Sequence, residues 1–293
     1  MRVLVTGAGG FSGGHVARRL ARAGFEVLAL TRTSPVAPPA HPESAQRFRS
    51  LQADLADPDT LPEDIDAVVH AAATSIWRGI TVDRMIHDNV LATRMLVEHA
   101  LAAGARRFVF FSSMSAFGRV ERPVAEETTP VTDPDAYGAT KLLCEQLLQD
   151  VAEDLPSVSL RLPSVIGRGA HRNWPSETLR KLKLNEPLAY YNPHAAYNNA
   201  VHEADLSALI GGLLQRELSG ADMIVLGAAG QIEVAGLVER MAVRTGSDSP
   251  LSVVEGPRAP FTIDCTKAVR DYGYAPMEIG AMIDRFVTEN LES

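Results

Sequence analysis

The chain has 293 residues, of which 46% are hydrophobic and 22% are charged, and its formal net charge is −8. These values are typical of a globular protein with one large α/β domain or two smaller ones, and they exclude a disordered chain. The acidic balance argues against a nucleic-acid partner. Two cysteines cannot form a disulfide framework or a four-cysteine zinc site, so we predict no metal.

No apolar run in the sequence approaches the roughly 18–20 residues that a membrane span requires. The apolar run at the N-terminus passes into glycines within a few residues, which is typical of a strand and not of a signal peptide. We therefore expect a cytoplasmic protein that does not interact with a membrane.

Apolar runs alternate with helical patterns through about residue 165. The pattern predicts strands at 2–6, 26–30, 67–70, 107–112 and 157–161, and helices at 12–23, 81–103 and 134–152. Strands that alternate with helices predict a doubly wound parallel sheet of the Rossmann type within an α/β fold.

The pattern changes after Gly167. Helices are predicted at 176–184, 203–215, 233–244 and 278–291, within segments rich in polar residues and proline. We therefore expect a dinucleotide-binding domain at 1–167, to which 198–215 returns, and a smaller C-terminal substrate-binding unit at 168–293.

Glycines dominate the turn between the first strand and the first helix, in the sequence VTGAGGFSGG at 5–14. Gly7 permits a tight turn, Gly10 lets the backbone approach a phosphate, and Gly13 lets the helix pack against the sheet. Backbone N–H groups at the start of the helix then face the anion. The turn therefore predicts a binding site for the diphosphate of a dinucleotide.

Arg32 follows the second strand, where an acidic residue would take the ribose 2′-hydroxyl of NAD. An arginine at this place accommodates the 2′-phosphate of NADP, so the sequence favours NADP over NAD. Asp54, in the segment QADLAD, is a candidate contact for the adenine edge.

A serine, a tyrosine and a lysine form a candidate catalytic set. Ser113 stands at the end of a predicted strand, where ligands bind in open parallel sheets. Tyr137 and Lys141 are four residues apart and share one face of a predicted helix. A lysine ammonium beside a phenol lowers the pKa of that phenol, which makes the tyrosine a usable proton donor and acceptor.

Taken together, these motifs resemble the extended (atypical) short-chain dehydrogenase/reductases, of the NAD-dependent epimerase/dehydratase family. The matching segments occur in the family's order and cover nearly the whole chain: TGAGGFSG (6–13), HAAA (70–73), NVLATRMLVEHA (89–100), SSMSAFG (112–118), YGATK (137–141), LRLPSVIG (160–167), NNAVHEADLSALI (198–210) and DCTKAVRDYGYAP (264–276).

The resemblance implies that Tyr137 is the catalytic acid and base, that Lys141 binds the nicotinamide ribose, and that Ser113 orients the reacting oxygen. It also implies a homodimer formed by the helices at 81–103 and 134–152. With the residues above, the predicted cofactor contacts are Gly7, Gly10, Phe11, Ser12, Gly13, Arg32, Asp54, Leu55, Ala71, Ala72, Ala73, Asn89, Tyr137, Lys141, Leu162 and Pro163.

Ser113 is followed by Met114 and Ser115, whereas family members that dehydrate sugars carry an acidic pair there. We therefore reject a dehydratase. The sequence favours an NADP-dependent reductase of a 4-keto nucleotide sugar. Three alternatives stay open: a nucleotide-sugar 4-epimerase with resident NAD, a carbonyl reductase for a non-sugar ketone, and a non-catalytic NADP-binding regulator.

The stretch at 168–183 carries five basic residues and one acidic residue, which fits an anionic substrate such as a nucleotide diphosphate. A solvated helix face explains the same charges equally well. The predicted substrate contacts are Ser113, Ser164, Arg172, Asn173 and Arg258.

Overall fold

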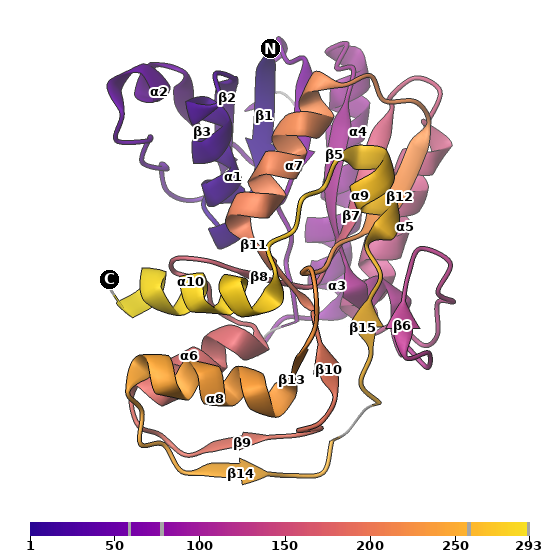
Figure 1. The fold of residues 1–293 in the computed structure, drawn as a ribbon. Coiled ribbons are helices and arrows are strands. Elements are labelled where there is room, and N and C mark those ends of the chain that lie inside the picture. The colour runs from indigo at the N-terminus through magenta and orange to yellow at the C-terminus, as the bar shows by residue number, and fades with distance from the viewer. Residues whose placement is uncertain (58–59, 77–78, 257–258, 292–293) are drawn as a thin grey trace. The chain divides into compact units, whose positions relative to one another are not determined.

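The computed structural model describes residues 1–57, 60–76, 79–256 and 259–291. It divides into two compact units, which are described separately. Unit 1 comprises Met1–Arg119, Val131–Arg161 and Ser207–Ile224, and unit 2 comprises Val120–Pro130, Leu162–Leu206 and Val225–Ser293. Figure 1 shows the chain as a ribbon coloured from its N-terminus to its C-terminus.

A seven-stranded sheet forms the centre of unit 1, in the order β12-β7-β5-β4-β1-β2-β3. The pairs β1–β2, β1–β4, β2–β3 and β4–β5 are parallel, so the Rossmann-type α/β prediction is confirmed. The strands are β1 (Arg2–Thr6), β2 (Glu26–Thr31), β3 (Phe48–Gln52), β4 (Ala67–His70), β5 (Phe108–Ser113), β7 (Ser157–Leu162) and β12 (Ala221–Val225).

Helices cover both faces of this sheet because its strands are apolar on both sides. Leu4 and Phe108 pack in one buried cluster with Leu96 of α4 (Ala92–Ala102) and Leu148 of α5 (Ala136–Asp150). Side chains alternate along β1, so Val3 and Val5 point to the face of the sheet opposite Leu4. There α1 (Phe11–Arg22) and α7 (Glu203–Gln215) lie together, as Figure 1 shows.

The helix predicted at 81–103 is not one regular helix. It consists of α3 (Val82–Met85), a π-helical segment η2 (Ile86–Leu91) and α4. The wider π-turn changes the regular hydrogen bonding of the helix backbone. Two side chains contact the backbone carbonyl oxygen of Asn89: Thr93 Oγ1 donates to it at 2.5 Å, and Cys144 Sγ lies 3.4 Å away. The prediction of a continuous helix is therefore wrong at the segment that contains Asn89.

In the seven-stranded sheet the sequence pattern misses β3 and β12. It also misses the short strands of unit 2 and two short helices, α2 (Pro42–Gln46) and α9 (Thr266–Tyr272). The strands predicted at 26–30, 107–112 and 157–161 are present but end at Thr31, Ser113 and Leu162. A short 3₁₀ helix, η3 (Met114–Phe117), follows β5 directly.

Unit 2 is built around an apolar cluster between three helices, α6 (Trp174–Lys183), α8 (Val234–Thr245) and α10 (Ile279–Leu291). Leu179, Leu237 and Phe286 are core members of this cluster. Paired short strands complete the unit: β6 (Val124–Ala125) with β15 (Thr262–Ile263), β8 (Ser164–Ile166) with β11 (Ala200–His202), β9 (Leu188–Tyr190) with β14 (Leu251–Val253), and β10 (Ala196–Tyr197) with β13 (Ile232–Glu233).

Candidate active site

The glycine-rich turn lies between β1 and α1, as predicted, and its geometry requires glycine. Gly7 has a φ of +67°, and a Cβ added there would lie 2.6 Å from the backbone nitrogen of Ala72. The N-cap of α1 is Gly10, which has no side chain to bond the N–H groups of the first turn. The turn therefore offers a cradle of backbone groups at a helix N-terminus, which suits a phosphate group.

A cavity of about 290 Å³ opens beside this turn, at the ends of β1, β2 and β4. Eight of the predicted cofactor residues line it: Gly7, Gly10, Arg32, Asp54, Leu55, Ala71, Ala72 and Ala73. The carboxylate of Asp54 accepts a hydrogen bond from the backbone N–H of Ala56 at 3.1 Å. The cavity therefore has the glycine turn at one end, where a phosphate can bind, and its lining fits a dinucleotide.

Other predicted cofactor residues do not line this cavity. Phe11, Ser12 and Gly13 form the first turn of α1. Leu162 ends β7, and Pro163 separates it from β8. Their contacts with a cofactor stay predictions.

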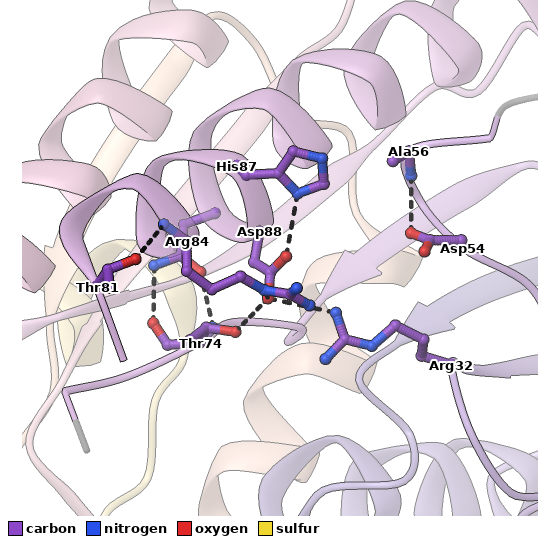
Figure 2. A network of polar contacts seen from close by, with 9 residues as sticks. Arg32, Asp54, Ala56, Thr74, Thr81, Arg84, His87 and Asp88 are labelled. Atoms are coloured by element: carbon purple, nitrogen blue, oxygen red, sulfur yellow. Dashed lines mark hydrogen bonds and ion pairs between the residues drawn. The ribbon is translucent and has the colours of Figure 1, made fainter. Parts of the chain in front are cut away.

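The cavity wall also contains polar residues that the sequence did not single out, among them Thr74, His87 and Asp88. Figure 2 shows that Arg32 points toward Asp88, with a guanidinium nitrogen 3.3 Å from the carboxylate. The prediction of NADP required Arg32 to be available to a 2′-phosphate. The ion pair with Asp88 weakens that prediction. No sequence motif identifies Asp88 as a cavity residue. Its position directly before Asn89, a predicted cofactor contact, could have suggested it.

The catalytic candidates lie on β5 and α5. Ser113 ends β5, and its hydroxyl accepts from the backbone N–H of Ser115 at 3.1 Å, which caps η3. The helix α5 begins with Asp135 as its N-cap, whose side chain accepts from the N–H of Gly138 at 2.8 Å. A Cβ added at Gly138 would lie 2.0 Å from the carbonyl oxygen of Ser115, so glycine is required where α5 meets η3. This contact fixes the start of the helix next to Ser113.

Lys141 is buried, with its ammonium group directed at β5. Its Nζ donates to the carbonyl oxygen of Phe111 at 2.7 Å and lies 5.6 Å from the centre of the Tyr137 ring. The structure therefore brings Tyr137 and Lys141 together on one face of α5, as the four-residue spacing predicts.

The expected lowering of the tyrosine pKa is not found in the chain by itself. Burial raises the pKa of Tyr137 to about 12, and the negative charge of Asp135 adds to this shift. Burial also lowers the pKa of Lys141 to about 8, against a smaller opposing effect of Cys144 and Glu145. The prediction was wrong for the chain by itself, because burial of the phenol is the largest influence on its pKa.

Asn89 is buried and ties the cavity wall to α5. Its amide nitrogen donates to the carbonyl oxygen of Thr74 at 2.9 Å and to the hydroxyl of Thr140 at 3.0 Å. Its amide oxygen accepts from the N–H of Thr74 at 2.7 Å. These contacts support a positioning role, in which Asn89 holds the end of the β4 segment against the helix of Tyr137.

A buried histidine connects β1, β4 and α4. His70 lies 2.6 Å from the hydroxyl of Thr6 through Nδ1 and 2.9 Å from the hydroxyl of Thr93 through Nε2. The Thr93 proton goes to the carbonyl of Asn89, so Nε2–H donates to Thr93 and Nδ1 accepts from Thr6. Burial, with a smaller contribution from the charge of Lys141, lowers the pKa of His70 to about 3.

His70 is expected to make stability fall in mild acid. Its pKa is about 3 in the folded chain and near 6.5 when exposed, so the unfolded chain binds the proton first. This contribution is complete above pH ~6.5 and is lost as the pH falls toward ~3, with a slope of about 1.4 kcal/mol per pH unit. Urea unfolding between pH 7.5 and 5 should show a steeper loss in the native chain than in His70→Gln. Equal slopes would contradict a neutral buried imidazole.

Among the predicted substrate residues of unit 2, Asn173 has clear structural partners. The Asn173 side chain caps α6 by accepting from the N–H of Ser176 at 3.0 Å, and its Nδ2 donates to the carbonyl of Val165 at 3.0 Å. Ser164 begins β8, and Arg172 has a φ of +61°. Arg258 lies outside the described residues. Roles of these residues toward a substrate stay predictions.

The basic stretch at 168–183 is partly neutralised within unit 2. Arg180 pairs with Glu177 at 2.8 Å and with Glu186 at 2.7 Å, all three being exposed. For this arginine the solvated helix face is therefore the better of the two interpretations.

Two features are absent from the residues that the structure describes. No group of three or more histidine, cysteine, aspartate or glutamate side chains is arranged to hold a metal ion. No helix in the described parts of the chain is long and apolar enough to cross a membrane.

Comparison with known proteins identifies the class. The model of the NAD-dependent epimerase/dehydratase family matches residues 3–227. UDP-glucose 4-epimerase of Streptomyces lividans is 28% identical over 282 residues, which are 88% of this chain and 84% of that enzyme. The chain spans about half the length of other curated relatives, such as 48% of the Bacillus subtilis UDP-glucose 4-epimerase. The structure of MoeE5 in complex with UDP-glucuronic acid and NAD superposes with a TM-score of 0.83 and 25% identity, and the alignment covers 99% of this chain and 98% of MoeE5.

The parallel sheet and the glycine turn have the architecture of the short-chain dehydrogenase/reductases. The chain belongs to the NAD-dependent epimerase/dehydratase family.

Proposed function

We propose that the chain is a nucleotide-sugar 4-epimerase that works with a resident NAD. Unit 1 is then the dinucleotide-binding domain, and unit 2 is the substrate-binding unit. The observation that carries the proposal is the serine, tyrosine and lysine set on β5 and α5, in the same unit as the glycine turn and its cavity. The full-length likeness to MoeE5, which was solved with a UDP-sugar and NAD, supports the choice of ligands.

The 4-epimerase replaces the 4-keto reductase that the sequence favoured. The reductase interpretation depended on NADP and therefore on Arg32, which contacts Asp88. The relatives compared above include two 4-epimerases and one complex with NAD, and they do not support a preference for NADP.

We infer which residues of unit 1 would hold each part of NAD. The turn from Gly7 to Gly10 and the first turn of α1 would hold the diphosphate, and Ala71–Ala73 would pass beside it. Lys141 would bind the nicotinamide ribose. When bound in its oxidised form, NAD supplies a hydride acceptor and a positive charge that favours the phenolate of Tyr137.

The chain's own residues then move one proton. Tyr137 Oη accepts the proton of the sugar 4-hydroxyl while the C4–H bond breaks, and a 4-ketone forms on the sugar. Tyr137 would return the proton to the ketone oxygen when C4 is reduced from its other face. Ser113 donates a hydrogen bond to the same oxygen. No net oxidation occurs, and no acidic residue directly follows Ser113 to remove water from the sugar.

The proposal predicts epimerisation without added cofactor. Purified protein is incubated with UDP-glucose, UDP-galactose and UDP-glucuronate, and proton NMR follows each sugar. We expect a mixture of the two C4 epimers from at least one substrate, and mass spectrometry of the denatured protein should detect NAD. Turnover that consumes NADPH stoichiometrically would instead favour the reductase, and nucleotide binding without any turnover would favour the regulator.

We propose in addition that the chain forms a homodimer through α3, η2, α4 and α5. The apolar side chains of Val82, Ile86, Leu91 and Leu143 on these helices are exposed in the single chain. Light scattering of the purified protein tests this, and a monomer at micromolar concentration would contradict it.

A further inference from the structure

Asp88 is a charged residue in the wall of the cavity, and the chemistry proposed above does not use it. Its side chain is only 7% exposed. Figure 2 shows its carboxylate at the centre of a polar network, where it accepts from Arg84 Nε at 2.7 Å and from Thr74 Oγ1 at 2.8 Å. His87 Nδ1 lies 3.1 Å from its other oxygen. Asp88 is thus held in place by neighbours on both sides.

The carboxylate of Asp88 is ionised throughout the physiological pH range. Burial by itself raises the pKa of this group, but the hydrogen bonds from Arg84, Thr74, His87 and Arg32 outweigh burial and hold the pKa well below its usual range. The cavity wall therefore contains a fixed negative charge.

Of the four side chains described as contacting the Asp88 carboxylate, Arg32 does so at the longest distance. Its side chain is 53% exposed, and its 3.3 Å contact with Asp88 is longer than those of Arg84 and Thr74. Arg32 follows β2, where a dinucleotide presents its adenosine ribose. A 2′-phosphate at this place would need the guanidinium that Asp88 holds.

We propose that Asp88 is a specificity-determining residue that makes the cavity select NAD over NADP. It does so by holding Arg32, whose guanidinium a 2′-phosphate would otherwise use. This inference rests on the proposed function, because it assumes that the cavity binds the adenosine half of a dinucleotide. Arg32 by itself would indicate NADP, whereas Arg32 held by Asp88 is consistent with NAD.

The test measures which nucleotide is bound and does not depend on activity. Each protein is equilibrated with equal concentrations of NAD and NADP until the bound ratio is constant, and bound nucleotides are quantified by mass spectrometry after gel filtration. Asp88→Asn keeps the shape and removes the charge. We expect the bound NADP:NAD ratio to rise about tenfold in Asp88→Asn, which corresponds to about 1.4 kcal/mol. Asp83→Asn, an exposed acid on α3, is the matched control and should leave the ratio unchanged.

Two arginine variants make the test independent of how well Asp88→Asn folds. Arg32→Ala in the native background should change the ratio less than threefold, since Asp88 already holds the guanidinium. A large loss of NADP binding in Arg32→Ala would overturn the inference. Adding Arg32→Ala to Asp88→Asn should cancel most of the tenfold gain, and a gain that persists would also overturn it.

The outcomes separate this inference from the proposed function. An unchanged ratio in folded Asp88→Asn, with NAD still bound at one per chain, would overturn the role of Asp88 and leave the proposed function standing. Failure of the native protein to bind either nucleotide would overturn both.

Discussion

Replacing Tyr137 with phenylalanine is expected to reduce turnover by roughly two to four orders of magnitude, the loss typical of removing a general acid and base. The variant should bind NAD as the native chain does. Phenylalanine keeps the ring near Lys141, whose Nζ lies 5.6 Å from the ring centre, and removes only the hydroxyl that moves the proton. The start of α5 should stay intact, because the Asp135 cap bonds the backbone of Gly138 and not the phenol.

The measurement for Tyr137→Phe is kcat on the best substrate together with the bound NAD content. Tyr272→Phe, on α9 in unit 2, removes a phenol hydroxyl elsewhere and serves as the control. An unchanged kcat in Tyr137→Phe would refute the catalytic assignment. Loss of NAD from the variant would instead assign the hydroxyl to cofactor binding.

The second large effect concerns the stability of unit 1. Glu145 of α5 accepts two hydrogen bonds from Arg161 of β7, at 2.9 and 2.6 Å, and one from Ser112 of β5 at 2.5 Å. The Glu145 and Arg161 side chains are 14% and 6% exposed. Glu145→Gln removes one charge and leaves the guanidinium uncompensated, so the free energy of unfolding should fall by about 3–5 kcal/mol.

Chemical denaturation followed by circular dichroism measures this loss. The matched control is Glu98→Gln, which breaks the exposed ion pair with Arg94 on α4 and should have little effect. Equal effects of the two substitutions would contradict a structural role of the Glu145 pair. The same pair joins Ser112 to α5, so Glu145→Gln should also weaken the placement of Ser113, the next residue.

The centre of the fold could be predicted because its signals are local. The run Arg2–Thr6, the glycines after it and the helix pattern of α1 lie within one short segment. The strands that the pattern misses, β3 and β12, are the two edges of the sheet. Polar residues interrupt both, as in FRSLQ and ADMIV, because an edge strand is only partly buried.

The finer features of the site depend on contacts between distant parts of the sequence. Arg32 and Asp88 are 56 residues apart, and no spacing rule joins them. The π-helical segment that contains Asp88 and Asn89 is not marked by a break in the apolar pattern. The pKa of Tyr137 was mispredicted for a related reason, since the degree of burial of a phenol is a property of the packed structure.

The central claim is that hydride leaves C4 of a nucleotide sugar and returns to C4 of the same molecule. The most direct test supplies a UDP-hexose with deuterium at C4 and no added cofactor, and follows the label by NMR. We expect the C4 epimer with deuterium retained at C4. Loss of deuterium from C4 in the product, or conversion that occurs only after NADPH is added, would contradict this claim.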